Sequence, residues 1–247
     1  MSISSLKEVR PSSASILFSD CTIAAQPIQA LNTGSESIRP WDELLLRPGK
    51  NVAGWSPCRL VEEIYKSELG LGLDRLMVSL GCGWAARNPD KRVSINIHPR
   101  SLADEFFVRF ALQRIESEGI EAEQVSLEVL ESVCPGSVSD LVGGAQKLDE
   151  AGVLLGLDDF GKGRASMELA ARLPIRFIKI DQDFVSGQCR QPAGPRVLAG
   201  LVAFANCLGV MSIAEGIETT EQLRLLTSLG VGYGQGHILG FPEAIDL

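Results

Sequence analysis

The sequence predicts an α/β protein folded as a single (β/α)8 barrel. Eight short apolar segments alternate with helical patterns along the chain, and this alternation is typical of a mainly parallel sheet. The chain has 247 residues, close to the roughly 250 that eight strand–helix units occupy in a closed barrel. No G-x-G-x-x-G motif opens a helix after the first strand, which weakens the alternative of an open dinucleotide-binding sheet.

The expected strands are short and apolar, as strands buried on both faces should be. They cover residues 21–28, 41–47, 92–97, 125–130, 153–159, 177–181, 211–217 and 232–239. Between them, apolar residues recur at helical spacing over 59–67, 71–87, 101–118, 138–150, 164–173, 195–208 and 219–229. In the last helix, Thr219 and Thr220 followed by Glu221 and Gln222 indicate the start, and Gly230 indicates the stop. Residues 186–195 are expected to form a long loop, and residues 1–14 a loose leader before one domain over 15–247.

The composition is that of a globular protein, with 45% hydrophobic and 22% charged residues. No apolar run reaches the roughly 18 to 20 residues of a membrane span, and the polar N-terminus lacks a signal-peptide stretch. The net charge of −8 argues against binding to duplex DNA or an anionic membrane. Six cysteines without a C-x-x-C pair, beside two histidines, make a zinc site unexpected. The cysteines are expected to be reduced, as in a cytoplasmic protein.

Acidic residues at the ends of successive apolar segments are the most informative feature. They are Glu43, Glu128, Glu131, Asp158, Asp159, Glu215 and Glu218, and matching positions after other segments hold Asn96, Lys179 and Gln235. Because a barrel gathers its strand ends at one face, we expect these side chains to meet at one mouth. Seven carboxylates beside one lysine cannot all ionise unaided, since like charges raise each other's pKa. We therefore expect divalent cations that prefer oxygen ligands, such as magnesium, manganese or calcium.

Taken singly, each motif also has an ordinary structural explanation. Glu43 and Arg47 can form a salt bridge at a strand end, and Asp158–Gly161 can be a plain turn. Lys179 is harder to explain in this way, because a lysine within a buried strand usually faces something specific, such as a carboxylate cluster.

Taken together and in order, the motifs resemble those of the EAL-type domain, the cyclic di-GMP phosphodiesterase family, over about residues 16–243. The segments that carry the resemblance are Gln26-Pro27-Ile28, Glu43–Arg47, Ser94–Ile97, Leu127–Glu131, Leu157–Gly161, Ile178–Asp181, Ala214–Thr219, Gly234-Gln235-Gly236 and Phe241-Pro242. The resemblance implies a TIM-type barrel with one irregular, antiparallel first strand. It implies hydrolysis of one phosphodiester of cyclic di-GMP to linear pGpG with two Mg²⁺ or Mn²⁺ ions, and inhibition by Ca²⁺. A homodimer, with a regulatory protein as a further partner, is also implied.

The resemblance further assigns roles to the residues at the predicted mouth. The implied ligands of the first metal are Glu43, Asn96, Glu128 and Asp158, and those serving the second metal or its water are Asp158, Asp159 and Glu215. Lys179 would hold the attacking water, and Glu215 is either the general base or a ligand. The residues expected to orient ligands and water are Glu131, Glu218 and Gln235. Those expected to hold the nucleotide are Gln26, Leu45 and Arg47, the last being suited to a bidentate contact with phosphate.

Several positions depart from the family pattern. They are Leu44 for an alanine, Leu130 for a threonine, Pro48-Gly49-Lys50 for an aromatic and a histidine-proline, and Lys162 and Arg164 for a threonine and a tyrosine. None of these changes removes a charged or amide residue of the metal and water set, which favours an active enzyme. A second hypothesis is a module that binds cyclic di-GMP or a protein partner without turnover. A third, a magnesium-dependent barrel enzyme that enolises carboxylates with a lysine base, fits the acid-plus-lysine chemistry but not the motif order.

Overall fold

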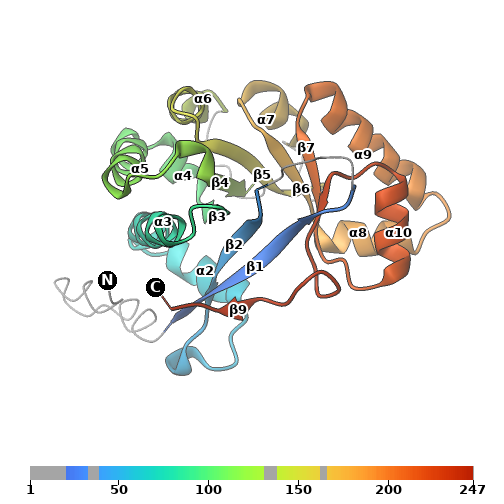
Figure 1. The fold of residues 1–247 in the computed structure, drawn as a ribbon, viewed down its shortest axis with the longest axis horizontal. Coiled ribbons are helices and arrows are strands. Elements are labelled where there is room, and N and C mark those ends of the chain that lie inside the picture. The colour runs from blue at the N-terminus through green and yellow to red at the C-terminus, as the bar shows by residue number, and fades with distance from the viewer. Residues whose placement is uncertain (1–20, 33–38, 131–137, 162–165, 247) are drawn as a thin grey trace.

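The computed structural model describes residues 21–32, 39–130, 138–161 and 166–246, and in this part of the chain eight strands close into a barrel. The strands are β1 (Thr22–Ala30), β2 (Trp41–Arg47), β3 (Arg92–Ile97), β4 (Val125–Leu130), β5 (Leu154–Phe160), β6 (Phe177–Ile180), β7 (Met211–Ala214) and β8 (Tyr233–Gly234). They pair in chain order from β2 to β8, and β1 completes the ring by pairing with both β8 and β2 (Figure 1). The leader expected over residues 1–14 lies outside the described residues.

The first strand is antiparallel to both of its neighbours, as expected. It pairs with β2 from Thr22 opposite Arg47 to Ile28 opposite Trp41, whereas the pairs from β2 through β8 are parallel. This register sets Gln26 directly opposite Glu43. A further short strand, β9 (Glu243–Ala244), pairs antiparallel with β1 at Ala24 and Ala25. It was not predicted, because two residues are too few to show an apolar period.

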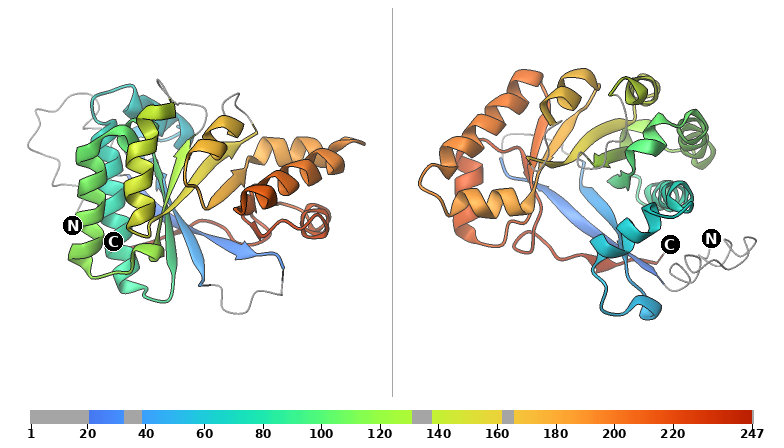
Figure 2. Two further views of the ribbon diagram at one scale, coloured as in Figure 1. Left: turned by 90° about the horizontal axis from the view of Figure 1, so that it is seen from above. Right: turned by 180° about the vertical axis from the view of Figure 1, so that it is seen from behind.

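Helices surround the barrel. They are α2 (Pro57–Tyr65), α3 (Gly70–Arg87), α4 (Pro99–Ala103), α5 (Glu105–Glu118), α6 (Val138–Glu150), α7 (Ser166–Arg172), α8 (Gln182–Cys189), α9 (Gly194–Leu208) and α10 (Thr220–Ser228). Figure 2 shows α3 to α6 grouped on one side of the strands and α8 to α10 on the other. None of these described helices is long and apolar enough to cross a membrane.

Two helical predictions were wrong. The single helix expected over 101–118 is two helices, because Asp104 interrupts it and its side chain accepts a hydrogen bond from the Phe107 N–H (2.8 Å) as the cap of α5. The loop expected over 186–195 is largely helical, since α8 runs to Cys189 and α9 begins at Gly194. Asp181 starts α8 by accepting from the Phe184 N–H (2.9 Å).

An aromatic layer fills the middle of the barrel. The Trp41 ring packs edge-on against those of Phe177 and Tyr233, with centroid separations of 4.9 and 5.8 Å. Gly156 makes room for this layer, because a Cβ there would lie 2.2 Å from the Phe177 ring. The barrel is therefore packed shut at this level, and any ligand must bind above it.

Candidate active site

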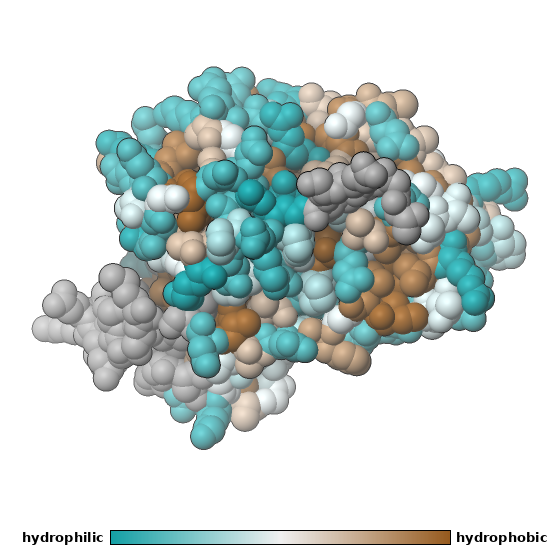
Figure 3. Space-filling view, viewed as in Figure 1, coloured by the Kyte–Doolittle hydropathy of each residue, from teal (hydrophilic) through white to brown (hydrophobic). Residues whose placement is uncertain are grey.

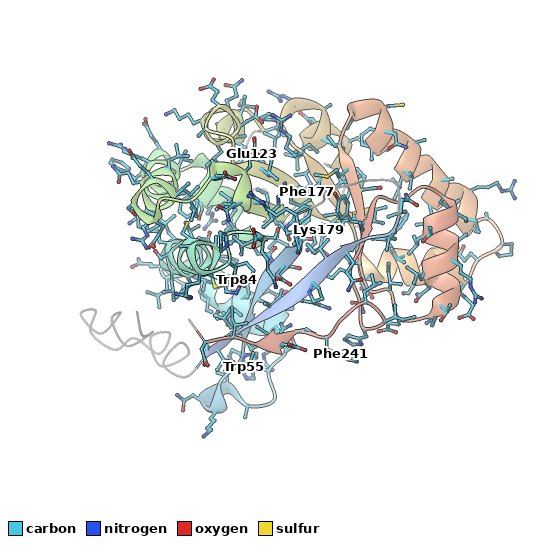
Figure 4. All side chains as sticks on the ribbon, viewed as in Figure 1. Trp55, Trp84, Glu123, Phe177, Lys179 and Phe241 are labelled. Atoms are coloured by element: carbon cyan, nitrogen blue, oxygen red, sulfur yellow. The ribbon has the colours of Figure 1, made fainter. Side chains whose placement is uncertain are left out.

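The site residues form the next layer of inward-pointing side chains above the aromatic plug. Side chains alternate along a strand, so the residue two positions after an inward one also points inward. Glu43 follows Trp41, Lys179 follows Phe177, and Gln235 follows Tyr233 in this way. Figure 4 shows Phe177 and Lys179 at the centre of the ring of strands. Two residues along each of these strands therefore separate the apolar layer from the polar layer above it.

Lys179 is the centre of this polar layer. Its side chain is 1% exposed, and its Nζ lies 2.7 Å from Glu128 Oε2, 2.8 Å from Glu215 Oε1 and 3.0 Å from Glu43 Oε2. Asp158 Oδ1 is farther away, at 3.6 Å. The lysine therefore touches carboxylates from β2 and β4 and from the end of β7, and lies near that of β5.

Amide and hydroxyl groups hold the carboxylates in place. The Asn96 amide donates to Glu43 Oε1 (2.6 Å) and the Gln235 amide donates to Glu43 Oε2 (2.9 Å). The Ser94 hydroxyl donates to Glu128 from the neighbouring strand. These bonds fix the direction in which Glu43 and Glu128 face the lysine.

The backbone around Gln235 explains the Gly-Gln-Gly sequence. The N–H of Gln235 donates to Ala214 O (2.8 Å), and its carbonyl accepts from the Ile217 N–H (3.0 Å). A Cβ on Gly236 would lie 2.3 Å from backbone atoms of Ile217, so only glycine permits this approach. The close contact presents the Gln235 amide to the site.

One ammonium group cannot balance the four carboxylates of Glu43, Glu128, Asp158 and Glu215 that surround it. Burial raises the pKa of Glu128 well above its usual range and also raises that of Asp158. Burial likewise raises the pKa of Glu215 to about 8, although Lys179 opposes this. The uncompensated acidity is the condition in which a divalent cation stabilises a site.

Glu43 and Lys179 are the exceptions, because their neighbours shift the pKa of each in the direction that favours its charged form. Burial raises the pKa of Glu43, but Lys179 and the amide donors outweigh it, so the pKa lies below its usual value. Burial lowers the pKa of Lys179, but the surrounding carboxylates outweigh it and hold its pKa well above the ordinary value.

The donor set fits oxygen-preferring cations. Asn96 Oδ1 is buried and has no hydrogen-bond partner among the described residues, so it is available as a ligand. One oxygen from each of Asp159, Asp181 and Glu215 lies within 4.8 Å of the other two, close enough to share a cation. Asp159 has a φ of 57°, a left-handed conformation that aspartate tolerates better than most residues.

Asp181 was not among the predicted site residues. It stands one position after β6, so the rule that picked out the other acids at strand ends also applies to it. It closes the Ile178–Asp181 segment, but only the fold shows that its carboxylate lies near those of Asp159 and Glu215, while it also caps α8. Of the residues that were predicted, Glu131 falls outside the described part of the chain, as do Lys162 and Arg164.

A pocket of about 250 Å³ opens above the polar layer. The predicted residues that line it are Gln26, Glu43, Leu45, Arg47, Glu215, Glu218 and Gln235, and those that were not predicted include Gln182, His237 and Pro242. In the space-filling view, hydrophilic residues gather over the middle of the molecule, and an apolar region lies over α8 and α10 (Figure 3). Acids and nucleotide-binding candidates thus share one cavity.

Two curated relatives of this chain are named as cyclic di-GMP phosphodiesterases, one of them as a probable one. Cyclic di-GMP phosphodiesterase PA2567 of Pseudomonas aeruginosa is 31% identical over 159 residues, which cover 64% of this chain and 27% of the relative. The probable cyclic di-GMP phosphodiesterase PdeA of Escherichia coli is 27% identical over 230 residues, covering 92% of this chain and 31% of the relative. The chain spans less than a third of the length of either protein.

Solved structures show the same fold. The PaMucR phosphodiesterase in its c-di-GMP complex has a TM-score of 0.80 at 24% identity, covering 91% of this chain and 97% of that chain. The EAL domain of FimX from Xanthomonas citri, in complex with c-diGMP, has a TM-score of 0.80 at 18% identity, covering 92% and 89%. The family model described as the EAL domain matches residues 20–242. The chain therefore belongs to the EAL domain family.

Proposed function

We propose that this chain is a metal-dependent phosphodiesterase that hydrolyses cyclic di-GMP to linear pGpG. The observation that carries the proposal is the acidic layer around Lys179, which lies beneath an open pocket and retains every described charged and amide residue of the expected set. Family membership and the names of the relatives support the same substrate. In the reaction, water adds to one phosphorus and the bond to the leaving ribose oxygen breaks.

The acids and Asn96 would hold two Mg²⁺ or Mn²⁺ ions. Glu43, Glu128 and Asp158 lie around Lys179, and the Asn96 amide donates to Glu43. Asp159, Asp181 and Glu215 offer a second group of oxygens. When bound, such ions lower the pKa of an attacking water and neutralise charge on the phosphate. Carboxylate and amide oxygens suit these ions better than they suit zinc.

Lys179 would hold the attacking water. An ammonium group has three N–H donors, and those of Lys179 point at Glu43, Glu128 and Glu215. Release of one of these acids frees a donor for water. The positive charge then favours the more basic form of that water in a site shielded from solvent.

The substrate would be held at the rim of the same pocket. Arg47 lines the pocket, and in the described part of the chain no hydrogen bond or ion pair of its side chain occupies the guanidinium. It can bind phosphate or a guanine edge in a bidentate manner, which an anionic ligand needs above so many carboxylates. Gln26 lines the same pocket, where its amide donates to Gly240 O (3.2 Å) and accepts from the Gln235 amide (3.3 Å).

Product analysis tests the proposal. Purified protein is incubated with cyclic di-GMP and either Mg²⁺ or Mn²⁺, and products are separated by chromatography. We expect pGpG from the wild type and from Glu63→Ala, which changes an exposed acid paired with Lys66 on α2, and little from Glu43→Ala. Binding of cyclic di-GMP without product, with either metal, would instead support a receptor.

A further inference from the structure

Asp74 is a buried acid that the proposed chemistry does not use. It is fully buried on α3. The other buried acidic residues among those that the structure describes lie on strands or directly after a strand, so Asp74 is the exception that lies within a helix. A buried carboxylate is costly unless it is hydrogen-bonded, so its partners indicate what it does.

The hydrogen-bond partners of Asp74 come from the segment that follows β3 and from the end of α2. Its Oδ2 accepts from the backbone N–H of His98 (2.9 Å), which caps α4, and from the hydroxyl of Ser101 within that helix. Its Oδ1 accepts from the Tyr65 hydroxyl at the end of α2 (2.6 Å). The Tyr65 ring in turn packs on the His98 ring, with centroids 4.6 Å apart. One carboxylate therefore ties α2 and α3 to the carboxyl end of β3.

The carboxyl end of β3 carries Asn96, and there only one of the two neighbouring strands still pairs with β3. The pairing of β3 with β2 stops at Ile95, whereas its pairing with β4 continues through Asn96 and Ile97. Two residues after Asn96, the hydrogen bond from the His98 N–H to Asp74 fixes the position of the backbone. The Asn96 amide donates to Glu43, and its buried oxygen has no hydrogen-bond partner within the described ranges of the chain.

We propose that Asp74 is a positioning residue for metal binding: by anchoring the end of β3, it holds the Asn96 oxygen where it can ligate a cation. The inference rests on the proposed function, because it assigns Asn96 as a ligand. A purely structural role for Asp74 predicts lower stability without a specific loss of metal affinity.

The test measures Mn²⁺ affinity by calorimetry without nucleotide, and the unfolding midpoint with chelator. Asp74→Ala removes the anchor, and Asp74→Asn keeps an acceptor for the His98 N–H. The matched control is Asp104→Ala, which also removes a carboxylate that accepts a backbone N–H, here that of Phe107 (2.8 Å) at the start of α5. Residues that orient metal ligands typically contribute about 10- to 100-fold in affinity, so we expect Asp74→Ala to raise the Kd for Mn²⁺ at least about tenfold.

Asp74→Asn should recover most of the affinity, and Asp104→Ala should stay within about twofold of wild type despite its lower midpoint. Equal changes in Kd for Asp74→Ala and Asp104→Ala, or no change in either, would overturn the inference and leave the proposed function standing. If Asp74→Ala does not fold, Ser101→Ala replaces it, with an expected loss of about threefold, and an unchanged Kd would again overturn the inference. A wild type that binds no Mn²⁺ would remove both proposals together.

Discussion

Lys179→Met separates the two things that this lysine does. Its Nζ lies within 3.0 Å of Glu43, Glu128 and Glu215, and the substitution leaves these acids buried without their cation. Breaking a buried ion pair by removing one partner typically costs about 3–5 kcal/mol. Acids that have lost their cation can instead bind a proton, and each unit by which a pKa shifts is worth about 1.4 kcal/mol. Protonation therefore keeps the loss of unfolding free energy from growing with the number of ion pairs removed.

The stability loss should depend on pH and on metal. Loss of the lysine raises the pKa values of Glu128 and Glu215 further above their unfolded values and also raises the lowered pKa of Glu43. The folded variant therefore binds more protons, relative to the unfolded chain, than the folded wild type does. Its unfolding free energy relative to that of the wild type then falls as pH rises, and we expect the loss to be about 3–5 kcal/mol at pH 8 and smaller at pH 5. Added Mn²⁺ should restore part of it, because cations replace the missing positive charge.

Turnover should fall more than binding. A group that acts chiefly in the transition state affects kcat rather than affinity, and removal of one such donor typically costs on the order of 100- to 1,000-fold. Urea unfolding at the two pH values measures stability, cyclic di-GMP affinity is measured in Ca²⁺, and kcat is measured in Mg²⁺. The control is Lys147→Met, which removes a half-exposed lysine paired with Glu105 (2.9 Å) and should cost less than about 1 kcal/mol.

Two results would refute the reasoning. Unchanged stability at pH 8 would show that the ion pairs around Lys179 contribute little. Unchanged turnover, or turnover and affinity lost in equal measure, would show that Lys179 does not position the water.

The other predictions concern metal and pH. Glu43→Ala and Asp158→Ala should each remove most activity while the barrel stays folded, because they weaken metal binding; near-normal turnover at low metal would show that the residue is not a ligand. Ca²⁺ should inhibit, because it accepts oxygen ligands but prefers longer bonds and looser geometry than Mg²⁺; equal turnover with both ions would contradict this. Metal binding should release protons at pH 7, because the pKa of Glu215 is about 8 without metal and a metal ligand must be deprotonated. Calorimetry in two buffers of different ionisation enthalpy should therefore give different heats of binding. Equal heats would show that no proton is released. Burial raises the pKa of Asp74 from 3.8 to about 6, so the unfolding free energy of the wild type should fall as pH rises through that interval; Asp74→Asn cannot titrate and should lack this slope in urea titrations, and a slope that persists would exclude Asp74 as its source.

The barrel could be predicted because its strands have simple patterns. Buried parallel strands read as short apolar runs, and the polar residues at their ends mark where each chain segment reaches the mouth. The boundary between α4 and α5 was missed because apolar residues keep their helical spacing through Asp104, and only its capping bond shows the break. The helix α8 was missed because glycine and polar residues weaken the pattern there, although Asp181 caps it well.

Part of the site could not be read from residue spacing. The acids around Lys179 follow from strand ends, but the contact of Asp74 with the β3 end depends on how α3 packs against the barrel. In sequence, Asp74 is one polar residue in a helical pattern, 24 positions from His98. Likewise, the pairing of Gln26 with Glu43 depends on the register of the antiparallel β1, which no local motif fixes.

The most direct test of the central claim is hydrolysis in water enriched in heavy oxygen, with the products examined by mass spectrometry. With Mg²⁺ or Mn²⁺, the wild type should convert cyclic di-GMP to pGpG that carries heavy oxygen on its terminal phosphate, because water attacks the phosphorus. Tight binding of cyclic di-GMP with no pGpG, across several metals and a wide range of protein concentrations, would contradict the claim and identify the acidic layer around Lys179 as part of a receptor.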